Sequence, residues 1–235
     1  MGRSHANVTE RATGRVLLAR LESVATPSGT DWLGDDEAGR LQAMASPQRR
    51  RSFLAGHWLA RQVASDWLRV DARRIALQRH HDGRPQLHVD GMPTPLSLSL
   101  SHSGDWLACA IATVAVGIDV ELPRRQRDLD ALARFAFSPD EVERLQRLPP
   151  GERSAAFQVL WTLKEARGKR TGEGLLPGQS RRVTTLPSDA ASADAASWIL
   201  DDGALALAID AGTEFTIEAG ETLASPLYWR YSNDR

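Results

Sequence analysis

Two segments of the chain show the spacing of apolar residues that is typical of long helices. Between residues 46 and 70, apolar side chains recur about every 3.6 positions, with Ser46 as a helix cap and Pro47 at the first helical position. A second helix is predicted over residues 153–170 and ends at Gly172. One long helix is therefore expected in each half of the chain.

A shorter helix is predicted between these two. Ser138 and Glu141 have the spacing of a capping box, and Pro139 stands at the first helical position. This helix should end near residue 148, because Pro-Pro-Gly follows at 149–151.

Strands are predicted where apolar and polar residues alternate or where a short apolar run is continuous. Residues 95–103 alternate leucine with serine, as in a half-buried strand with one polar face, and residues 106–113 are apolar enough for the centre of a sheet. Segment 179–197 is rich in small polar residues and is expected to be a long loop. Further strands are expected at 114–121, 197–200, 204–210 and 214–219.

The order of these elements predicts an α+β fold with helices packed on mainly antiparallel sheets. Residues 103–114 and 201–212 share a faint pattern, which suggests two similar halves. We expect an N-terminal half over 1–115 with the basic helix and the serine-faced strand. The C-terminal half, 116–235, should carry the carboxylate strand and the second long helix.

Composition narrows the function classes. The net charge is −1, from 29 basic and 30 acidic residues, which argues against a general nucleic-acid binder. The single cysteine, Cys109, excludes an internal disulfide or a thiolate metal cage. Residues 1–29 show no targeting pattern, and the longest apolar stretch, 106–116, is shorter than the roughly 20 residues of a membrane span. A soluble cytoplasmic protein that binds no membrane is expected.

Two carboxylates share one face of a predicted strand. In the strand 114–121, Asp119 and Glu121 point the same way, with Cα atoms about 6.5 Å apart. Two like charges side by side need a positive partner, and a divalent cation such as Mg²⁺ is one that carboxylate oxygens hold well. The alternative is neutralisation by nearby arginines: Arg124, Arg125 or Arg127.

Lysine is rare in this chain. Of the 29 basic residues, 27 are arginine, and the two lysines are Lys164 and Lys169. Trp161, Glu165 and Lys169 are four residues apart and lie on one ridge of the second long helix. An ordinary surface ion pair would explain Glu165 and Lys169. Lysine in a chain that otherwise uses arginine instead favours a chemical role, since an ammonium is compact and can give up a proton.

Two basic features point to an anionic ligand, and each also has a purely structural explanation. His102 between Ser101 and Ser103 could bind phosphate or could be a structural histidine. Residues 46–84 include nine arginines and only three aspartates, an excess of positive charge that suits either a phosphate site or a solvated helix face. The chain contains no GxSxG, P-loop, HExxH or CxxC motif.

Four motifs together resemble the 4′-phosphopantetheinyl transferase superfamily, in particular its surfactin-synthetase-activating type. The resemblance covers roughly residues 46–177. In chain order the motifs are SHSGDW at 101–106, GIDVE at 117–121, FSPDEVERL at 137–145 and WTLKEARGKRTGEGL at 161–175.

The resemblance implies a fold of two pseudo-symmetric α/β halves, each a helix packed on a mainly antiparallel sheet, with the active site in the cleft between them. It also implies a monomer that transfers the phosphopantetheine arm of coenzyme A to a serine of an apo acyl or peptidyl carrier protein, releasing 3′,5′-ADP. No nucleic acid takes part. Which carrier and which pathway, from fatty acid biosynthesis to secondary metabolism, stays open.

Carried over by position, Asp119, Glu121 and Glu165 would ligate Mg²⁺. Glu165 would also take the proton of the acceptor serine, directly or through a water on the metal, and Lys169 would contact the pyrophosphate. Attack on a pyrophosphate needs neutralisation of the charge that builds on the leaving oxygen, which a cation and an ammonium can supply.

The other implied contacts are to the phosphates of coenzyme A. Ser101 and His102 would bind the 3′-phosphate. Arg84 stands where the family often has lysine, in Gly-Arg-Pro instead of Gly-Lys-Pro, and should keep a phosphate contact. Either Arg50 or Arg51 would supply the arginine of the basic helix.

Two other functions are compatible with the same residues. The protein could be a regulatory or scaffold module that binds coenzyme A without transferase activity, or another Mg²⁺-dependent phosphotransfer enzyme. An intact metal-ligand set and both lysines favour the transferase. Since carrier proteins tend to be acidic around their serine, the arginine-rich segment 124–127 is a candidate docking edge.

Overall fold

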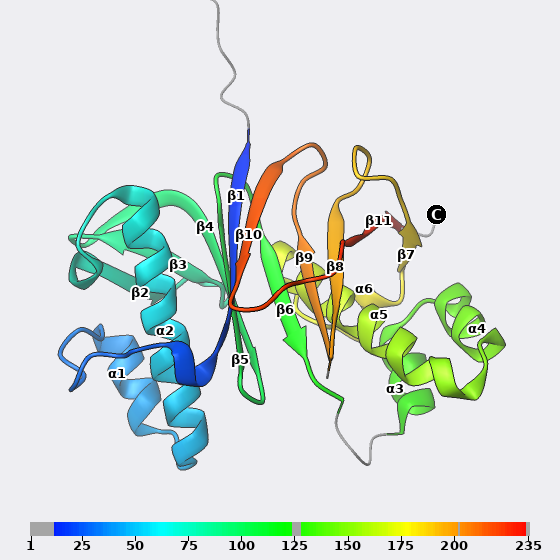
Figure 1. The fold of residues 1–235 in the computed structure, drawn as a ribbon, viewed down its shortest axis with the longest axis horizontal. Helices are drawn as coiled ribbons and strands as arrows, with labels where there is room; N and C mark the ends of the chain where they lie inside the picture. The colour runs from blue at the N-terminus through cyan, green and yellow to red at the C-terminus, as the bar shows by residue number, and fades with distance from the viewer. Residues whose placement is uncertain (1–11, 124–127, 202, 234–235) are drawn as a thin grey trace, which may run out of the picture.

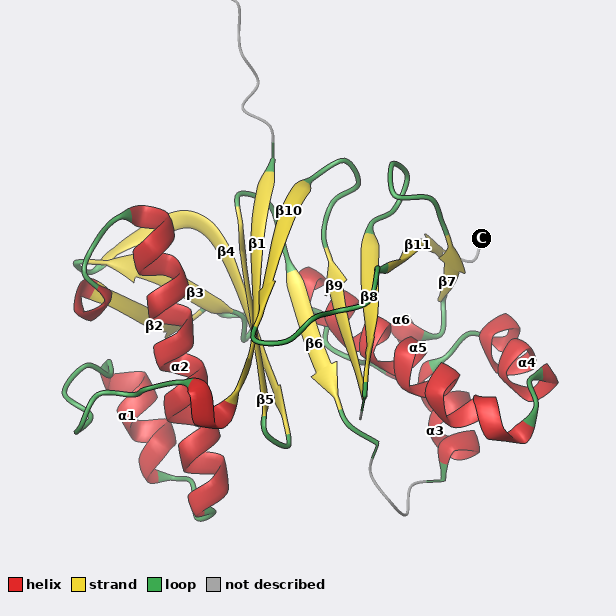
Figure 2. Cartoon of the chain, viewed as in Figure 1, coloured by secondary structure: helices red, strands yellow, loops and turns green. Residues whose placement is uncertain are grey.

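A computed structural model describes residues 12–123, 128–201 and 203–233. These residues form two sheets that lie side by side in the middle of the molecule, with helices on both outer sides (Figures 1 and 2). The candidate docking edge at 124–127 lies outside the described residues. No helix of the described chain is both long and apolar enough to cross a bilayer.

The first sheet has six strands in the order β10-β1-β5-β4-β3-β2, and helix α2 covers its outer face. Its elements are β1 (Thr13–Arg20), a 3₁₀ turn (Leu21–Ser23), α1 (Asp35–Gln42), α2 (Pro47–Leu68), a second 3₁₀ turn (Ala72–Arg74), β2 (Ile75–Arg79), β3 (Pro85–Val89), β4 (Met92–Ser103), β5 (Trp106–Ala112) and β10 (Glu214–Ala219).

The second sheet has five strands in the order β6-β9-β8-β11-β7, and helix α5 covers its outer face. Its elements are β6 (Gly117–Glu121), α3 (Leu129–Ala136), α4 (Pro139–Arg147), α5 (Pro150–Thr171), α6 (Pro177–Ser180), β7 (Val183–Pro187), β8 (Ala195–Leu200), β9 (Gly203–Ala208) and β11 (Leu227–Asn233).

The predicted α+β class with mainly antiparallel sheets is confirmed. Among the described strand pairs, β1 with β10 is the parallel one, and the others are antiparallel. In the chain, β10 stands between β9 and β11 of the second sheet, but it pairs with β1 of the first sheet and so ties the two halves together (Figure 1).

The main apolar core lies between the two sheets. Val16, Leu18 and Trp106 from the first sheet pack with Ile118 and Trp198 from the second, and all five side chains are buried. With α2 and α5 outside, the molecule has four layers in the order α, β, β, α. This places β4 and β6, which carry two of the motifs, next to each other where the sheets meet.

The three predicted helices form with the predicted caps. The Ser46 hydroxyl accepts from the Arg49 N–H at 3.3 Å at the start of α2. Ser138 and Glu141 form the capping box of α4. α5 ends at Gly172, whose φ of 77° is a left-handed conformation that glycine adopts freely.

The prediction of a long loop over 179–197 is wrong. This segment contains β7 and the start of β8. β7 pairs with β11, a strand that the sequence patterns did not predict either. β7 is polar but buried, and it bonds to the capping box of α4: the Thr184 hydroxyl donates to Ser138 Oγ at 2.8 Å, and the Thr185 N–H donates to Glu141 Oε1 at 2.7 Å. A strand whose polar residues are satisfied by tertiary contacts lacks the apolar alternation used to recognise strands.

Candidate active site

The serine-faced strand β4 joins the two sheets. β6 is the edge strand of the described second sheet, and the β4 hydroxyls accept hydrogen bonds from it and from the residue on either side: Val116 N–H to Ser97 at 3.2 Å, Ile118 N–H to Ser99 at 3.0 Å and Leu122 N–H to Ser103 at 3.1 Å. These bonds satisfy donors that an edge strand otherwise exposes. The alternating serines thus have a structural role between the halves.

The same stripe of hydroxyls holds the two carboxylates of β6. The Ser101 hydroxyl donates to Asp119 Oδ1 at 2.8 Å, and the Ser103 hydroxyl donates to Glu121 Oε2 at 3.3 Å. Asp119 is 4% exposed, although its strand neighbours Ile118 and Val120 face the apolar core on the other side. The predicted arrangement of the strand, with apolar residues on one face and carboxylates on the other, is confirmed.

Lys169 of α5 meets these residues from the outer side of the second sheet. Its ammonium donates to Asp119 Oδ1 at 2.7 Å and to the carbonyl oxygens of Ile118 at 3.0 Å and Leu100 at 3.3 Å. Three motifs that are far apart in the sequence therefore converge on one carboxylate. Glu165 stands one turn earlier on α5 and is partly buried.

Two glycines allow this close approach of α5. A Cβ atom on Gly117 would lie 1.9 Å from the carbonyl oxygen of Ala166, so only glycine lets β6 touch the helix backbone. On the helix itself, a Cβ atom on Gly168 would lie 2.5 Å from the carbonyl oxygen of Gly174. The glycine of GIDVE and the glycine before Lys169 are thus packing requirements of the site.

The carboxylates fit a magnesium ion in their chemistry. Asp119 Oδ2 is buried and has no hydrogen-bond partner among the described residues, which is costly unless a ligand completes it. Hard carboxylate oxygens are the donors that Mg²⁺ prefers. The oxygens of Asp119, Glu121 and Glu165 do not all lie within 4.8 Å of one another. In this arrangement the Lys169 ammonium is the positive partner of Asp119.

A cavity of about 330 Å³ opens beside this cluster. Lys169 lines it together with Ser99 and Leu100 of β4. The remaining walls come from both halves of the molecule and include three arginines: Arg40, His57, Leu77, Gln78, Arg79, Asp82, Gly83, Arg84, Pro85, Leu98, Gly168, Gly172 and Gly174. The position of the cavity agrees with a site between the two halves.

Two of these arginines repel each other. Burial and the positive charge of Arg79 lower the pKa of the Arg40 guanidinium, with Asp36 and Glu37 opposing the shift. Arg40 also lies over the ring of Phe53, at 5.0 Å from its centroid. Like charges held at one cavity wall are a favourable surface for an anion.

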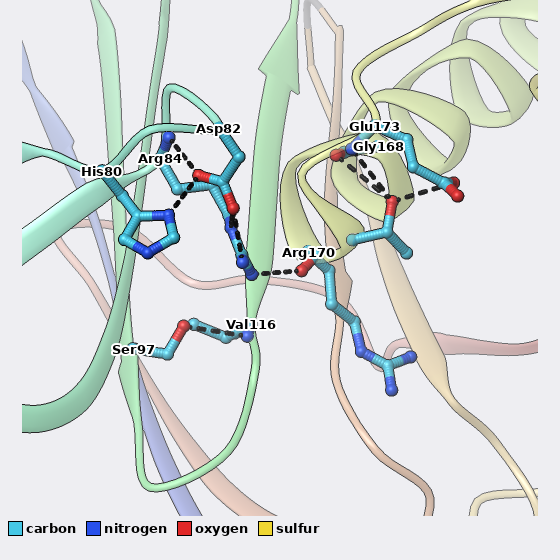
Figure 3. A network of polar contacts seen from close by, with 9 residues as sticks. His80, Asp82, Arg84, Ser97, Val116, Gly168, Arg170 and Glu173 are labelled. Atoms are coloured by element: carbon cyan, nitrogen blue, oxygen red, sulfur yellow. Dashed lines mark hydrogen bonds and ion pairs between the residues drawn. The ribbon is translucent and has the colours of Figure 1, made fainter.

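Arg84 connects the cavity wall to the end of α5. Its guanidinium donates to Asp82 Oδ2 at 2.7 and 2.9 Å and to the carbonyl oxygen of Arg170 at 3.0 Å (Figure 3). The Arg84 guanidinium lowers the pKa of the Asp82 carboxyl well below its usual range. The Gly-Arg-Pro variant of the motif therefore bridges the two halves at the cavity.

The other residues expected to touch phosphate lie outside the described cavity lining. At the end of α1, Arg50 donates to the carbonyl oxygens of Leu41 at 2.6 Å and Met44 at 3.4 Å, and Arg51 is exposed. Ser101 lies on Asp119, and His102 is exposed near the end of β4. Their contacts to a ligand stay a prediction.

A buried ionic cluster behind the cavity was not predicted. Glu37 of α1 accepts from Arg61 at 2.5 and 2.9 Å and is 2.5 Å from the Nδ1 atom of His57, a cavity residue. Burial opposes ionisation of Glu37, but the hydrogen bonds from His57 and Arg61 outweigh it and lower its pKa to about 2. Arg61 stands on the apolar face of α2, four residues after His57, which is the signal that could have revealed it.

Lys164 is not part of this site. Its ammonium is 2.8 Å from Glu141 Oε2 and also donates to the carbonyl oxygens of Ser180 and Val183. The side chain is 1% exposed. It therefore fastens α5 to the capping box of α4.

Two family models match adjacent parts of the chain. The 4′-phosphopantetheinyl transferase superfamily model matches residues 115–212, and the model of the 4′-phosphopantetheinyl transferase N-terminal region matches residues 28–114. The matched regions contain β4, β6 and α5, which form the cluster around Asp119.

Relatives that carry the same family name support this match. The 4′-phosphopantetheinyl transferase HetI of Nostoc sp. is 31% identical over 85% of this chain and 83% of its own length. A 4′-phosphopantetheinyl transferase of Bacillus subtilis is 29% identical over 77% of this chain and 79% of its own, and the Sfp transferase of Bacillus subtilis strain 168 is 30% identical over 61% and 67%. The chain belongs to the 4′-phosphopantetheinyl transferase superfamily, with the Sfp-type enzymes that transfer the phosphopantetheine group.

Proposed function

We propose that the protein transfers the 4′-phosphopantetheine arm of coenzyme A to a serine of an apo acyl or peptidyl carrier protein, in a Mg²⁺-dependent reaction that releases 3′,5′-ADP. One observation supports this most: Asp119 carries a buried oxygen without a partner and lies under Lys169, which lines a cavity rich in arginine. Carboxylate, ammonium and basic cavity are the parts that transfer from a pyrophosphate requires.

Coenzyme A brings several negative charges, which the cavity can bind. Arg40, Arg79 and Arg84 line it and would hold the phosphates, including the 3′-phosphate. Of the residues proposed from the motifs, His102 follows the cavity residues Ser99 and Leu100 along β4 and would take part, whereas the Ser101 hydroxyl is held by Asp119 Oδ1. Arg50 or Arg51 would require a larger movement, since Arg50 is bonded to the carbonyl oxygens of Leu41 and Met44 at the end of α1.

Asp119, Glu121 and Glu165 would hold Mg²⁺ together with the pyrophosphate. When bound, the ion neutralises charge on the pyrophosphate and on the leaving group. Ser101 and Ser103 orient Asp119 and Glu121 for this task through the hydrogen bonds described above.

Two residues of α5 act on the reacting groups. Glu165 takes the proton from the carrier serine as the serine oxygen forms its bond to the phosphorus of the phosphopantetheine arm. The bond from that phosphorus to the 3′,5′-ADP oxygen breaks. Lys169 places its ammonium on the departing phosphate and stabilises the charge that develops there.

Both walls of the cavity belong to one chain, which supports a monomeric enzyme. We place the reaction in the cytoplasm, where coenzyme A and apo carrier proteins are both present.

The test incubates the protein with coenzyme A, Mg²⁺ and several apo carrier proteins, followed by the intact mass of each carrier and chromatography of the nucleotides. The proposal expects one phosphopantetheine arm added to a carrier and an equal amount of 3′,5′-ADP. Tight binding of coenzyme A without any mass gain would favour the regulatory module instead. Release of a different nucleotide would favour another phosphotransfer reaction.

A further inference from the structure

The turn between β2 and β3 gathers three potential metal ligands outside the carboxylate site. His80, His81 and Asp82 are consecutive, and one ligand atom of each lies within 4.8 Å of the other two. Among the histidine, cysteine and acidic residues of the described chain, these three form the group whose ligand atoms lie this close together.

The turn holds these side chains together. The Gly83 N–H donates to the carbonyl oxygen of His80 at 2.8 Å, and the φ of 87° at Gly83 closes the turn. His80 Nδ1 is 3.0 Å from Asp82 Oδ1 (Figure 3). The rings of His80 and His81 are 3.9 Å apart between centroids. The three side chains therefore crowd on one side of the turn.

We infer that His80, His81 and Asp82 form a binding site for a divalent cation of the zinc class. Imidazole nitrogens suit Zn²⁺, Ni²⁺ or Cu²⁺, and two of them with one carboxylate leave a coordination position for water. Tetrahedral Zn²⁺ about 2.1 Å from each ligand separates the ligands by ~3.4 Å. His80 Nδ1 and Asp82 Oδ1, at 3.0 Å, are already near that separation, and His81 offers a ligand atom within the 4.8 Å that encloses the group, so His81 would close the remaining distance.

The carboxylate of Asp82 can serve this site without releasing its arginine. Arg84 uses Oδ2, at 2.7 and 2.9 Å through its side chain. Oδ1 faces His80 and accepts the backbone N–H of Arg84 at 3.0 Å, which leaves it a further lone pair. Since Arg84 shares the charge of Asp82, affinity rests on the two imidazoles, and Mg²⁺ should not compete.

The site has a structural consequence because the turn is fastened across the cavity. Arg84 donates to the carbonyl oxygen of Arg170, and a Cβ atom on Gly172 would lie 3.0 Å from Asp82 Oδ2. A cation bound to Asp82 would hold the turn, and with it Arg84, against the end of α5 (Figure 3). A ligand that binds only the folded state raises the melting temperature.

The test uses metal-freed full-length protein in excess Mg²⁺, which saturates the carboxylate site. Equilibrium dialysis against Zn²⁺ should give one bound ion per chain, and the melting temperature should rise with Zn²⁺. The double variant His80→Gln/His81→Gln should lose both effects. Asp82→Asn should weaken binding at least tenfold. Asp90→Asn is the matched control, because Asp90 also precedes a left-handed glycine and pairs with an arginine. This variant should bind Zn²⁺ as the wild type does.

Unchanged Zn²⁺ binding in the double histidine variant would overturn the inference, because the ion would then lie elsewhere. A second measurement needs no variant: Co²⁺ added to the wild-type protein in excess Mg²⁺ should give the visible absorption of histidine-ligated, low-coordinate Co²⁺. The spectrum of hydrated Co²⁺ alone would equally contradict the site.

Discussion

At the scale of single residues, the two lysines share one kind of environment. Each ammonium meets one carboxylate and two backbone carbonyls: Lys164 on Glu141 in the core, and Lys169 on Asp119 at the cavity. An ammonium is a compact donor that fits between carbonyls, whereas the planar fork of arginine does not. This explains lysine at both positions in a chain that otherwise uses arginine, although only Lys169 faces the cavity.

Lys169→Arg should therefore impair the reaction despite keeping the charge. The guanidinium cannot replace the ammonium between Leu100, Ile118 and Asp119, so we expect kcat for carrier loading to fall by roughly 10- to 100-fold. Steady-state kinetics checks this. Lys164→Arg is the matched control. It should lower the melting temperature and leave kcat close to that of the wild type. Wild-type kcat in Lys169→Arg would contradict the role given to the ammonium.

Glu165→Gln should abolish most of the activity and leave the fold intact. It removes the proposed base and a proposed metal ligand, and loss of a general base alone costs about 10²- to 10⁴-fold in rate. The rate is measured by carrier mass and the fold by circular dichroism. Glu173→Gln, on the turn after the same helix, should retain activity. Near-normal turnover in Glu165→Gln would remove Glu165 from the mechanism.

At the scale of secondary structure elements, contact between β6 and α5 builds the site. Gly117→Ala introduces a Cβ atom 1.9 Å from the Ala166 carbonyl, so the helix must shift. We expect a loss of about 1–3 kcal/mol in the free energy of unfolding, measured in urea, together with reduced activity as Lys169 moves. Gly151→Ala, with open space at the start of α5, should not destabilise the protein. Equal stability of the two variants would contradict the packing described for β6.

The attachment of α1 to α2 should depend on pH through Glu37. Its pKa falls from an ordinary 4.5 to about 2 on folding, so ionised Glu37 stabilises the folded state above pH 4.5 and loses this effect between pH 4.5 and 2. Glu37→Gln should cost about 3 kcal/mol at neutral pH, and its difference from the wild type should shrink below pH 4.5. Unfolding measured across this range checks the sign. A pH-independent difference would contradict it, and exposed Glu22→Gln serves as control.

Elements with caps and clean periodicity could be predicted from the sequence, and elements held by tertiary partners could not. α2, α4, α5 and β4 carry local signals that the structure preserves. β7 was missed because two of its buried residues are threonines, which bond to Ser138 and Glu141 of the α4 capping box and interrupt the apolar pattern. The pairing of Asp119 and Glu121 on one face followed from strand geometry, but Arg40 and Arg79 come together only through the fold. With arginine so common, no local pattern distinguished these two.

At the scale of the whole molecule, the site lies where the two sheets meet. The hydroxyls of β4 complete the open edge of β6, and β10 returns from the second half to pair with β1, so the first sheet contains strands from both halves and is hydrogen-bonded to the second. The boundary expected near residue 115 therefore separates two sets of motifs that fold into one structure. The cavity draws walls from both, and its two sides must stay aligned for the reaction.

The most direct test of this account is the metal dependence of carrier loading. The initial rate is followed by intact mass before chelation, after chelation and after Mg²⁺ is restored, in the wild type and in Asp119→Asn. We predict loss of the wild-type rate on chelation, full recovery with Mg²⁺, and little recovery in the variant, because Asp119 supplies the buried oxygen without a partner. Loading that continues unchanged in the chelator, or a normal response of Asp119→Asn, would contradict the proposed centre.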